Sequence, residues 1–354
     1  MNDRRILVTG GAGFLGSHFV RHALRSGAAF VANLDLLTYA GDLRRLDDIA
    51  GDLRYVFVRG DVAEGRAIRE VFAAYRPDVV VHYAAESHVT RSELASDAFF
   101  RTNVEGTRVV LESALEAGVE RVVHVSTDEV YGPILSGAFG EDDKLPGEGA
   151  ATSAYARSKA LADDLARSLA AGSTRSAVIV ARPTNAFGPH QFPEKAFPRW
   201  ATRALRGEPL LVWGDGLYVR QWLYAEDFAR AIALLVERGD PGGVYNVGPR
   251  HDPEITNLAL AQWLRDRLEL TQERLQMTAY DRPDHDRRYA VDPSRIEALG
   301  WAPGEVWEQF GRTLDWYRDH AAWWEPHIAE AESIYADAVE AGRGAPAAAR
   351  GARP

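Results

Sequence analysis

Two short polar motifs in this chain have residue types that could carry out acid–base chemistry. In the first, a hydroxyl and two adjacent acids, Thr127, Asp128 and Glu129, closely follow an apolar run that ends at Val125. Two carboxyl groups at the edge of a protein core cost free energy unless they are solvated, paired or used. Taken alone, this motif is explained equally well by a polar loop that follows a strand.

The second motif favours chemistry. Tyr155 and Lys159 are four residues apart in a predicted helix over residues 153–171, so their side chains share one face. A lysine ammonium beside a phenol favours the phenolate, and we expect it to lower the pKa of Tyr155. With the Thr127 hydroxyl in reach, such a phenol can accept the proton of an alcohol while a bound cofactor accepts the hydride.

The N-terminal segment predicts the kind of cofactor. An apolar run over residues 6–9 leads into Gly10, Gly13 and Gly16, and a helical pattern follows over residues 16–26. Glycines in this arrangement allow a tight turn and let backbone amides approach a pyrophosphate at the start of a helix. The pattern is typical of a dinucleotide-binding loop.

The next predicted strand supports this interpretation. It covers residues 30–34 and is followed by Asp35, about 20 residues beyond the glycines, where an acid can bind the ribose hydroxyls of adenosine. The charge of Asp35 would repel a ribose phosphate, so the sequence favours NAD over NADP. Arg44 and Arg45 lie close by in the sequence and weaken that preference.

Further along the chain, apolar strands alternate with helices. Predicted strands cover residues 55–58, 79–84, 121–125 and 177–181, and helices between them include 65–75, 103–116 and 153–171. This alternation predicts an α/β fold with a Rossmann-type doubly wound parallel sheet in residues 1–185. Ligands of such sheets bind at the carboxyl ends of the strands, where the first motif is expected.

Residues 186–330 are predicted to form a smaller α/β lobe that binds substrate over this edge of the sheet. Its predicted helices cover residues 197–205, 226–237, 257–268 and 306–319, with further short segments at 210–212 and 243–248. We expect a nucleotide-type ligand between the lobes. Residues 331–354 end in a run rich in Gly, Ala, Pro and Arg, which predicts a flexible tail.

Composition disfavours several other functions. The net charge of −10 argues against a nucleic-acid partner, and the absence of cysteine excludes disulfides, thiol nucleophiles and thiolate metal sites. No segment approaches the roughly 18 uninterrupted apolar residues of a membrane helix. We therefore expect a cytoplasmic protein with no metal site.

A series of motifs across residues 5–327 resembles the extended short-chain dehydrogenase/reductase family, and within it the dTDP-glucose 4,6-dehydratases. These motifs occupy residues 9–16, 37–41, 84–89, 126–132, 155–159, 192–195, 222–227 and 281–289. The adjacent acids after Thr127 are the most specific part of the resemblance.

The resemblance implies a reaction at a hexose attached to a nucleoside diphosphate. Tyr155, helped by Thr127 and Lys159, would deprotonate the carbon 4 hydroxyl as NAD takes the hydride. Glu129 would then remove the carbon 5 proton while Asp128 protonates the departing carbon 6 hydroxyl. Return of the hydride to carbon 6 would give a 4-keto-6-deoxyhexose, with dTDP-glucose as the first candidate substrate. This chemistry needs an acid and a base whose pKa values differ.

The resemblance also implies binding residues and an assembly. Those implied for NAD are Gly10, Gly13, Phe14, Leu15, Gly16, Asp35, Thr38, Asp61, Val62, Ala84, Tyr155 and Lys159. Those implied for the nucleotide sugar are Ser87, His88, Asn185, Lys195, Arg220, Asn257, His285 and Arg287. Arg287 could instead belong to a solvated run of charges. A homodimer through two helices, about 97–117 and 153–171, is the family's usual assembly.

The chain departs from the family pattern at Thr90, Ala186, Gln221 and Phe228, near the expected sugar and phosphate cleft. These changes leave the substrate open to another sugar or to a uracil nucleotide, and the outcome open to a 5,6-alkene. A related epimerase or decarboxylase would share the oxidation at carbon 4 but has no use for Asp128 and Glu129. A non-catalytic NAD-binding regulator would have no need of the tyrosine and lysine pair.

Overall fold

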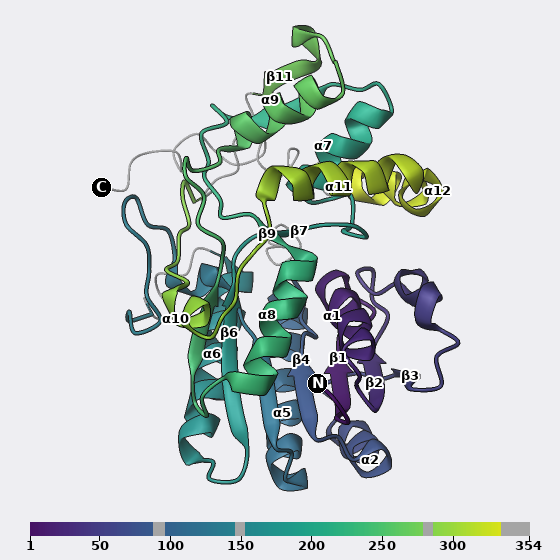
Figure 1. Cartoon of the computed structure of the whole chain (residues 1–354), viewed down its shortest axis with the longest axis vertical. Coiled ribbons are helices and arrows are strands. Elements are labelled where there is room, and N and C mark those ends of the chain that lie inside the picture. Colours follow the sequence, from purple (N-terminus) through teal and green to yellow (C-terminus); the bar gives the residue numbers. More distant parts are fainter. Residues whose placement is uncertain (88–95, 146–152, 279–285, 334–354) are drawn as a thin grey trace.

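The computed structural model describes residues 1–87, 96–145, 153–278 and 286–333. Its centre is a seven-stranded sheet in the order β10-β6-β5-β4-β1-β2-β3, in which every neighbouring pair is parallel. The strands are β1 (Arg5–Thr9), β2 (Phe30–Asp35), β3 (Tyr55–Arg59), β4 (Val79–His82), β5 (Arg121–Val125), β6 (Ala177–Pro183) and β10 (Val244–Val247). The predicted Rossmann-type sheet is confirmed (Figure 1).

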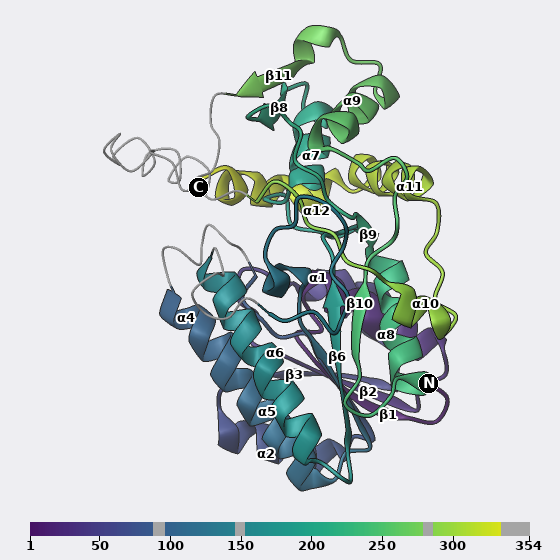
Figure 2. The same ribbon diagram turned by 90° about the vertical axis from the view of Figure 1, so that its left-hand side faces the viewer.

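The sheet lies between two layers of helices. Figure 2 shows α1 (Phe14–Arg25) and α8 (Ala225–Arg238) on one face, and α2 (Gly65–Tyr75), α5 (Thr107–Ala117) and α6 (Ala154–Gly172) on the other. A short α4 (Ser96–Phe100) and a π-helical turn (Arg101–Gly106) run directly into α5. Central strand residues such as Val80 and Val123 are fully buried because both faces of the sheet are covered.

One strand of the sheet comes from the region that the sequence assigned to the smaller lobe. β10 pairs in parallel with β6, placing Tyr245 beside Ala181 and Asn246 beside Arg182. The preceding helix α8 packs along α1. The assignment of residues 226–237 and 243–248 to the smaller lobe is therefore corrected. Both segments are apolar enough to be buried against the sheet. The strand is only 4 residues long, and its sequence does not indicate which strand it pairs with.

The smaller lobe lies beyond the carboxyl ends of the strands, at the top of Figure 1. Its elements are β7 (Ala186–Phe187), α7 (Ala196–Leu205), β8 (Leu210–Trp213), β9 (Leu223–Tyr224), α9 (Asn257–Arg267), a turn (Gln272–Arg274), β11 (Leu275–Thr278), α11 (Val306–Asp319), α12 (Ala321–Trp324) and a turn (Glu325–His327). A separate helix α10 (Ser294–Ala298) packs on β10.

An aromatic core holds this lobe together. Phe187 stacks on Phe310 with ring centroids 4.0 Å apart, and Phe197 and Trp222 pack against the same ring. Such aromatic pairs stabilise a core by more than the burial of their apolar surface alone. Of the expected tail, residues 334–354 lie outside the described part of the chain. No helix among the described residues is long and apolar enough to cross a membrane.

Candidate active site

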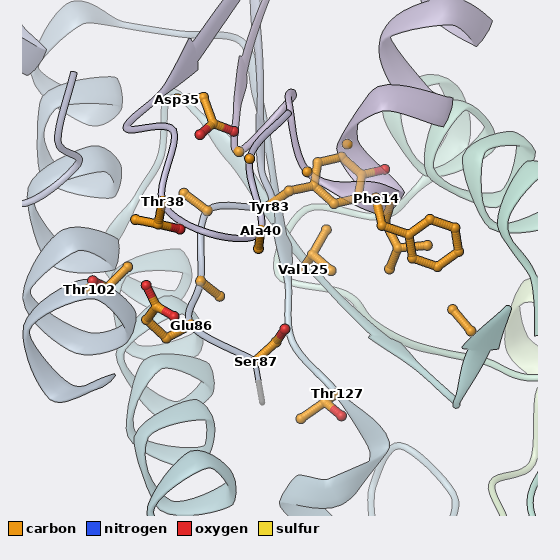
Figure 3. Close-up of a pocket in the computed structure, with 18 of the residues that line it drawn as sticks. Phe14, Asp35, Thr38, Ala40, Tyr83, Glu86, Ser87, Thr102, Val125 and Thr127 are labelled. Carbon is orange, nitrogen blue, oxygen red and sulfur yellow. The ribbon is translucent and has the colours of Figure 1, made fainter. Parts of the chain in front are cut away.

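A cavity of about 310 Å³ runs along the carboxyl ends of the central strands. Figure 3 shows Asp35 at one end of it and Thr127 at the other. Its lining contains every residue predicted for the cofactor: Gly10, Gly13, Phe14, Leu15, Gly16, Asp35, Thr38, Asp61, Val62, Ala84, Tyr155 and Lys159. It also contains Thr127, Asp128 and Glu129, so one cavity holds both predicted motifs.

The glycine-rich loop has no room for a side chain at Gly10 or Gly16. Gly10 adopts φ +71°, and an added Cβ would lie 2.7 Å from the Ala84 backbone nitrogen. A Cβ at Gly16 would lie 2.2 Å from the Gly10 carbonyl oxygen. The loop therefore packs closely between β1 and α1, and its backbone borders the cavity at the start of a helix. This geometry fits a dinucleotide pyrophosphate.

Backbone amides orient the acid at the end of β2. Asp35 accepts hydrogen bonds from the amides of Ala12 at 3.0 Å and Leu37 at 2.8 Å. Its carboxylate borders the cavity, where a ribose diol could donate to the remaining lone pairs. The site thus fits NAD at its adenosine end.

The two nearby arginines are engaged elsewhere. Arg45 is buried and donates to the carbonyl oxygens of Ala12, Ala40 and His190 at 2.9, 2.6 and 3.0 Å. Arg44 forms an ion pair with Asp42 at 2.7 Å. Both guanidinium groups are occupied by these contacts, so neither is arranged to bind a ribose phosphate. This agrees with the preference for NAD.

The first motif forms a short helical turn after β5. Thr127 caps the 3₁₀ helix Asp128–Tyr131, because its hydroxyl accepts the Glu129 amide at 3.3 Å and donates to Asp128 Oδ1 at 3.3 Å. Asp128 is 3% exposed, and burial, followed by the charge of Glu129, raises its pKa to about 7. Glu129 is more exposed than Asp128. Asp128 therefore holds its proton more tightly than a solvated aspartate does.

The second motif lies in the first turns of α6. Ser153 caps the helix by accepting the Ala156 amide at 3.0 Å, and Lys159 Nζ donates to the Val125 carbonyl oxygen at 2.7 Å. Burial, then the charge of Glu129, raises the pKa of Tyr155, while a hydrogen bond with Thr127 opposes this shift. The expected lowering by Lys159 is not what this arrangement gives, because desolvation and two carboxylates act more strongly on the phenol.

The residues predicted to hold the nucleotide sugar fall into two groups. Ser87, Asn185 and Lys195 line the cavity. Arg220, Asn257 and Arg287 do not, and gather instead around residues 218 and 219 of the smaller lobe. His88 and His285 lie outside the described residues.

The two arginines of the second group differ in their surroundings. Arg220 is 8% exposed, lies 4.8 Å from the centre of the Tyr289 ring, and its charge lowers the pKa of Asp128. Arg287 is more exposed and forms a bidentate pair with Asp215 at 2.7 Å to each oxygen. Arg220 is thus electrostatically coupled to Asp128.

The model of the NAD dependent epimerase/dehydratase family matches residues 6–248. The chain belongs to this family. Among its relatives, dTDP-glucose 4,6-dehydratase from Streptomyces niveus is 42% identical over 330 residues, covering 91% of this chain and 95% of that protein. The enzyme of the same name from Neisseria meningitidis serogroup B is 40% identical over 345 residues, covering 91% and 95%.

Solved structures of the epimerase/dehydratase family have the same fold. A dTDP-glucose 4,6-dehydratase from Streptomyces venezuelae with NAD bound gives a TM-score of 0.85 at 42% identity, covering 91% of this chain and 99% of that one. A UDP-glucose 4-epimerase from Thermotoga maritima with UDP-glucose gives 0.80 at 28% identity, covering 90% and 99%.

Two residues of the family motifs at this site were not among the predicted site residues. Glu194 is 2% exposed and lines the cavity. Tyr289 is 6% exposed, and its pKa is raised by burial and by the charge of Glu129. Both lie inside motifs that carried the family resemblance, 192–195 and 281–289, so the sequence held a signal for them.

Proposed function

We infer that this protein is an NAD-dependent nucleotide-sugar 4,6-dehydratase. The observation that carries the inference is the pair of carboxyl groups at Asp128 and Glu129, which borders the same cavity as Thr127, Tyr155 and Lys159. An oxidation alone would need only the latter three residues. An acid and a base beside them provide for loss of water as well.

In the oxidation, Tyr155 accepts the proton of the carbon 4 hydroxyl. The Thr127 hydroxyl, whose hydrogen bond lowers the pKa of Tyr155, helps to hold that oxygen. Lys159 lies one helical turn from Tyr155 on the same face of α6, and burial lowers its pKa to about 8. NAD supplies the hydride acceptor for this step and the hydride donor for the last one. The residues that line its site at the ends of β1 and β2, such as Gly10 and Asp35, would hold it.

In the elimination, the ketone at carbon 4 acidifies the proton at carbon 5. Glu129 removes that proton as the general base, and Asp128 protonates the leaving hydroxyl at carbon 6 as the general acid. A pKa of about 7 keeps a substantial fraction of Asp128 protonated near neutral pH. The different exposures of the two groups therefore support the assignment of their roles.

Polar atoms near these groups support a hydroxyl-rich ligand. Within the described residues, several buried oxygens that belong to cavity-lining residues have no hydrogen-bond partner: Asp128 Oδ2, Ser126 Oγ, Thr184 Oγ1 and Asn185 Oδ1. Buried polar groups are normally satisfied. A hexose, with a hydroxyl on most of its carbons, can satisfy such a set.

The substrate that we propose is a dTDP- or UDP-hexose, with dTDP-glucose first. Its sugar would contact Ser87, Asn185 and Lys195, and its nucleoside diphosphate would lie toward Arg220, Asn257 and Arg287 of the smaller lobe. His88 and His285, expected to bind the same ligand, lie outside the described residues. Arginine is suited to bidentate contact with phosphate. The relatives named as dTDP-glucose 4,6-dehydratases support this choice.

The proposal includes a cytoplasmic homodimer that joins through helices 97–117 and 153–171. In this arrangement α5 and α6 would form a four-helix contact with their copies. The two helices pack side by side on the outer face of the sheet in Figure 2.

The decisive experiment is incubation of the purified protein with dTDP-glucose, followed by mass measurement of the product and its base-induced ultraviolet absorbance. We expect loss of one water and formation of a 4-keto-6-deoxy sugar. UDP-glucose and other sugars provide the comparison. Interconversion at carbon 4 without loss of water would instead identify an epimerase and would refute the proposal.

A further inference from the structure

A buried ion pair lies directly behind the proposed catalytic residues. Arg182 on β6 donates from Nε to Asp163 Oδ2 at 2.9 Å and from Nη2 to Asp163 Oδ1 at 2.6 Å. Arg182 is 1% exposed and Asp163, on α6, is fully buried. Separation of the pair would leave a charge unpaired in the core, so the two groups hold β6 and α6 in a fixed relation.

Asp163 shares a helix face with the oxidation residues. Tyr155, Lys159 and Asp163 are spaced by four residues on α6 and therefore lie one above the other. The charge of Asp163 also opposes the lowering of the Lys159 pKa by burial. One end of the ion pair is thus joined to the groups proposed for the oxidation.

The third nitrogen of the Arg182 guanidinium contacts the last residue of the carboxyl motif. Its Nη1 donates to the Tyr131 hydroxyl at 2.6 Å, and its guanidinium lies 4.7 Å from the centre of the Tyr131 ring. Tyr131 is the last residue of the turn that contains Asp128 and Glu129. Its ring stacks on Phe139 with centroids 5.0 Å apart.

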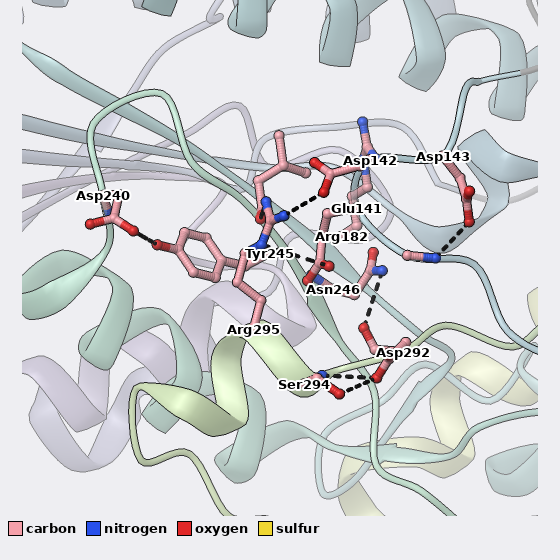
Figure 4. Close-up of polar contacts among 12 residues, drawn as sticks. Glu141, Asp142, Asp143, Arg182, Asp240, Tyr245, Asn246, Asp292, Ser294 and Arg295 are labelled. Carbon is pink, nitrogen blue, oxygen red and sulfur yellow. Dashed lines mark hydrogen bonds and ion pairs between the residues drawn. The ribbon is translucent and has the colours of Figure 1, made fainter.

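Asn246 completes the set of contacts. The Tyr131 hydroxyl donates to Asn246 Oδ1 at 2.9 Å, and Asn246 Nδ2 donates to the carbonyl oxygens of Phe139 and Asp292 at 3.0 and 3.3 Å. Asn246 and Arg182 are register partners on β10 and β6, and both appear in Figure 4. The Tyr131 hydroxyl thus has one donor and one acceptor partner, and its position is fixed by two strands.

We propose that Tyr131 is a positioning residue that sets Asp128 and Glu129 against the sugar for the elimination step. The inference rests on the proposed dehydratase function. Tyr155 is held by α6 and Thr127 by the end of β5, whereas the carboxyl pair lies in the turn that the Tyr131 hydroxyl fastens. A shift of that turn moves the acid and the base, whereas Tyr155 and Lys159 are held by α6 and stay in position.

The test is Tyr131→Phe, which removes the hydroxyl and keeps the ring on Phe139. Oxidation is followed in a single turnover with dTDP-glucose by the absorbance of the reduced cofactor, and elimination by exchange of the carbon 5 hydrogen with solvent deuterium. A misplacement on the order of 1 Å can cost about a hundredfold in rate, so we expect elimination to slow at least about tenfold. Oxidation should stay within about twofold of wild type, so reduced cofactor accumulates.

Tyr245→Phe is the matched control. Tyr245 precedes Asn246 on β10 and is fully buried, and its hydroxyl contacts the Asp240 amide at 2.9 Å and Oδ2 at 3.1 Å. Figure 4 shows it directed toward Asp240, away from Arg182. This variant removes an equivalent hydroxyl without touching the catalytic turn, so its melting temperature should fall comparably and its two rates should keep their wild-type ratio.

Two results would overturn the positioning role. The first is that oxidation and elimination slow equally in Tyr131→Phe. The second is that the ratio of the elimination rate to the oxidation rate is the same in Tyr131→Phe as in Tyr245→Phe. Failure of the proposed function is seen separately, because the wild-type protein would then form no 4-keto-6-deoxy product from any nucleotide sugar.

Discussion

Two adjacent carboxyl side chains at this site have different surroundings. Asp128 is buried where it borders the cavity, and burial raises its pKa to about 7, while Glu129 is more exposed. The charge of Glu129 also disfavours ionisation of Asp128, so the buried Asp128 retains its proton. A single turn after β5 can therefore supply an acid and a base that act on neighbouring carbons.

Glu129→Gln should remove the base and leave the cofactor site intact. We expect exchange of the carbon 5 hydrogen with solvent deuterium to slow by roughly 10²–10⁴-fold, the usual contribution of a positioned general base. Bound NAD, measured after denaturation of the purified protein, should stay at the wild-type level. Exchange at the wild-type rate would assign the base to another residue.

The raised pKa of Asp128 also predicts a dependence of stability on pH. The folded protein binds this proton up to about pH 7, whereas an unfolded aspartate releases it near pH 4, so the unfolding free energy falls between these values as pH rises. Asp128→Asn removes the titrating carboxyl group and therefore the decrease in unfolding free energy that it causes. Denaturant unfolding should show the variant gaining up to roughly 4 kcal/mol over wild type between pH 4 and pH 8.

A difference between wild type and Asp128→Asn that is constant over this pH range would mean that Asp128 ionises normally in the folded protein. The variant should also lose dehydration, because the leaving hydroxyl no longer receives a proton. Stability and activity would then change in opposite directions at one residue.

At the scale of elements, loops from distant parts of the chain enclose the cofactor cavity and one arginine joins them. The guanidinium of Arg45 contacts carbonyl oxygens of the glycine-rich loop, the loop after β2 and the segment that leads into the smaller lobe. It also lies 5.3 Å from the centre of the Trp323 ring on α12. The C-terminal helices are in this way coupled to the cofactor site.

Arg45→Met should therefore accelerate the loss of NAD. The three loops lose their common donor, and the cavity can open more easily, so we expect NAD to dissociate about tenfold faster, equivalent to about 1.4 kcal/mol. The release of NAD into a scavenging enzyme measures this rate. Arg44→Met is the control, because this neighbouring arginine is more exposed and contacts Asp42 and His327 instead. Equal rates in the two variants would contradict the role of Arg45.

At the scale of the whole molecule, the two lobes interleave along the chain. The segment that follows β6 builds part of the smaller lobe, returns through α8 and β10 to the large sheet, and leaves again for α9 and α11. These repeated crossings restrict how far the lobes can move apart. The cavity at their junction is accordingly bordered by residues from both, such as Asp128 and Glu194.

The proposed dimer predicts that one substitution on the surface of α6 changes the oligomeric state. Leu161 and Leu165 on α6 are half-buried in the single chain, so a copy could bury their remaining surface. Leu161→Glu should place a charge in that contact and convert a dimer to a monomer in analytical ultracentrifugation. Arg167→Glu, at an exposed position farther along the same helix, should leave the dimer intact. A wild-type monomer would refute the proposal at once.

Local sequence patterns were sufficient to predict most of this fold. Backbone preference and burial are encoded within a few residues by the glycine spacing, the acid at position 35 and the apolar runs. The strands and their alternation with helices were therefore predictable. The Thr127 and Tyr155 motifs were predictable as partners because the carboxyl ends of parallel strands share one edge of a sheet.

Tertiary structure alone decided the rest. The pairing of β10 with β6, the charge of Arg220 acting on Asp128 and the contacts from Arg182 to Asp163 and Tyr131 join residues far apart in the chain. Desolvation likewise reversed the expected shift in the pKa of Tyr155. Sequence spacing cannot report such effects, because burial and electrostatic environment arise only when separate elements pack together.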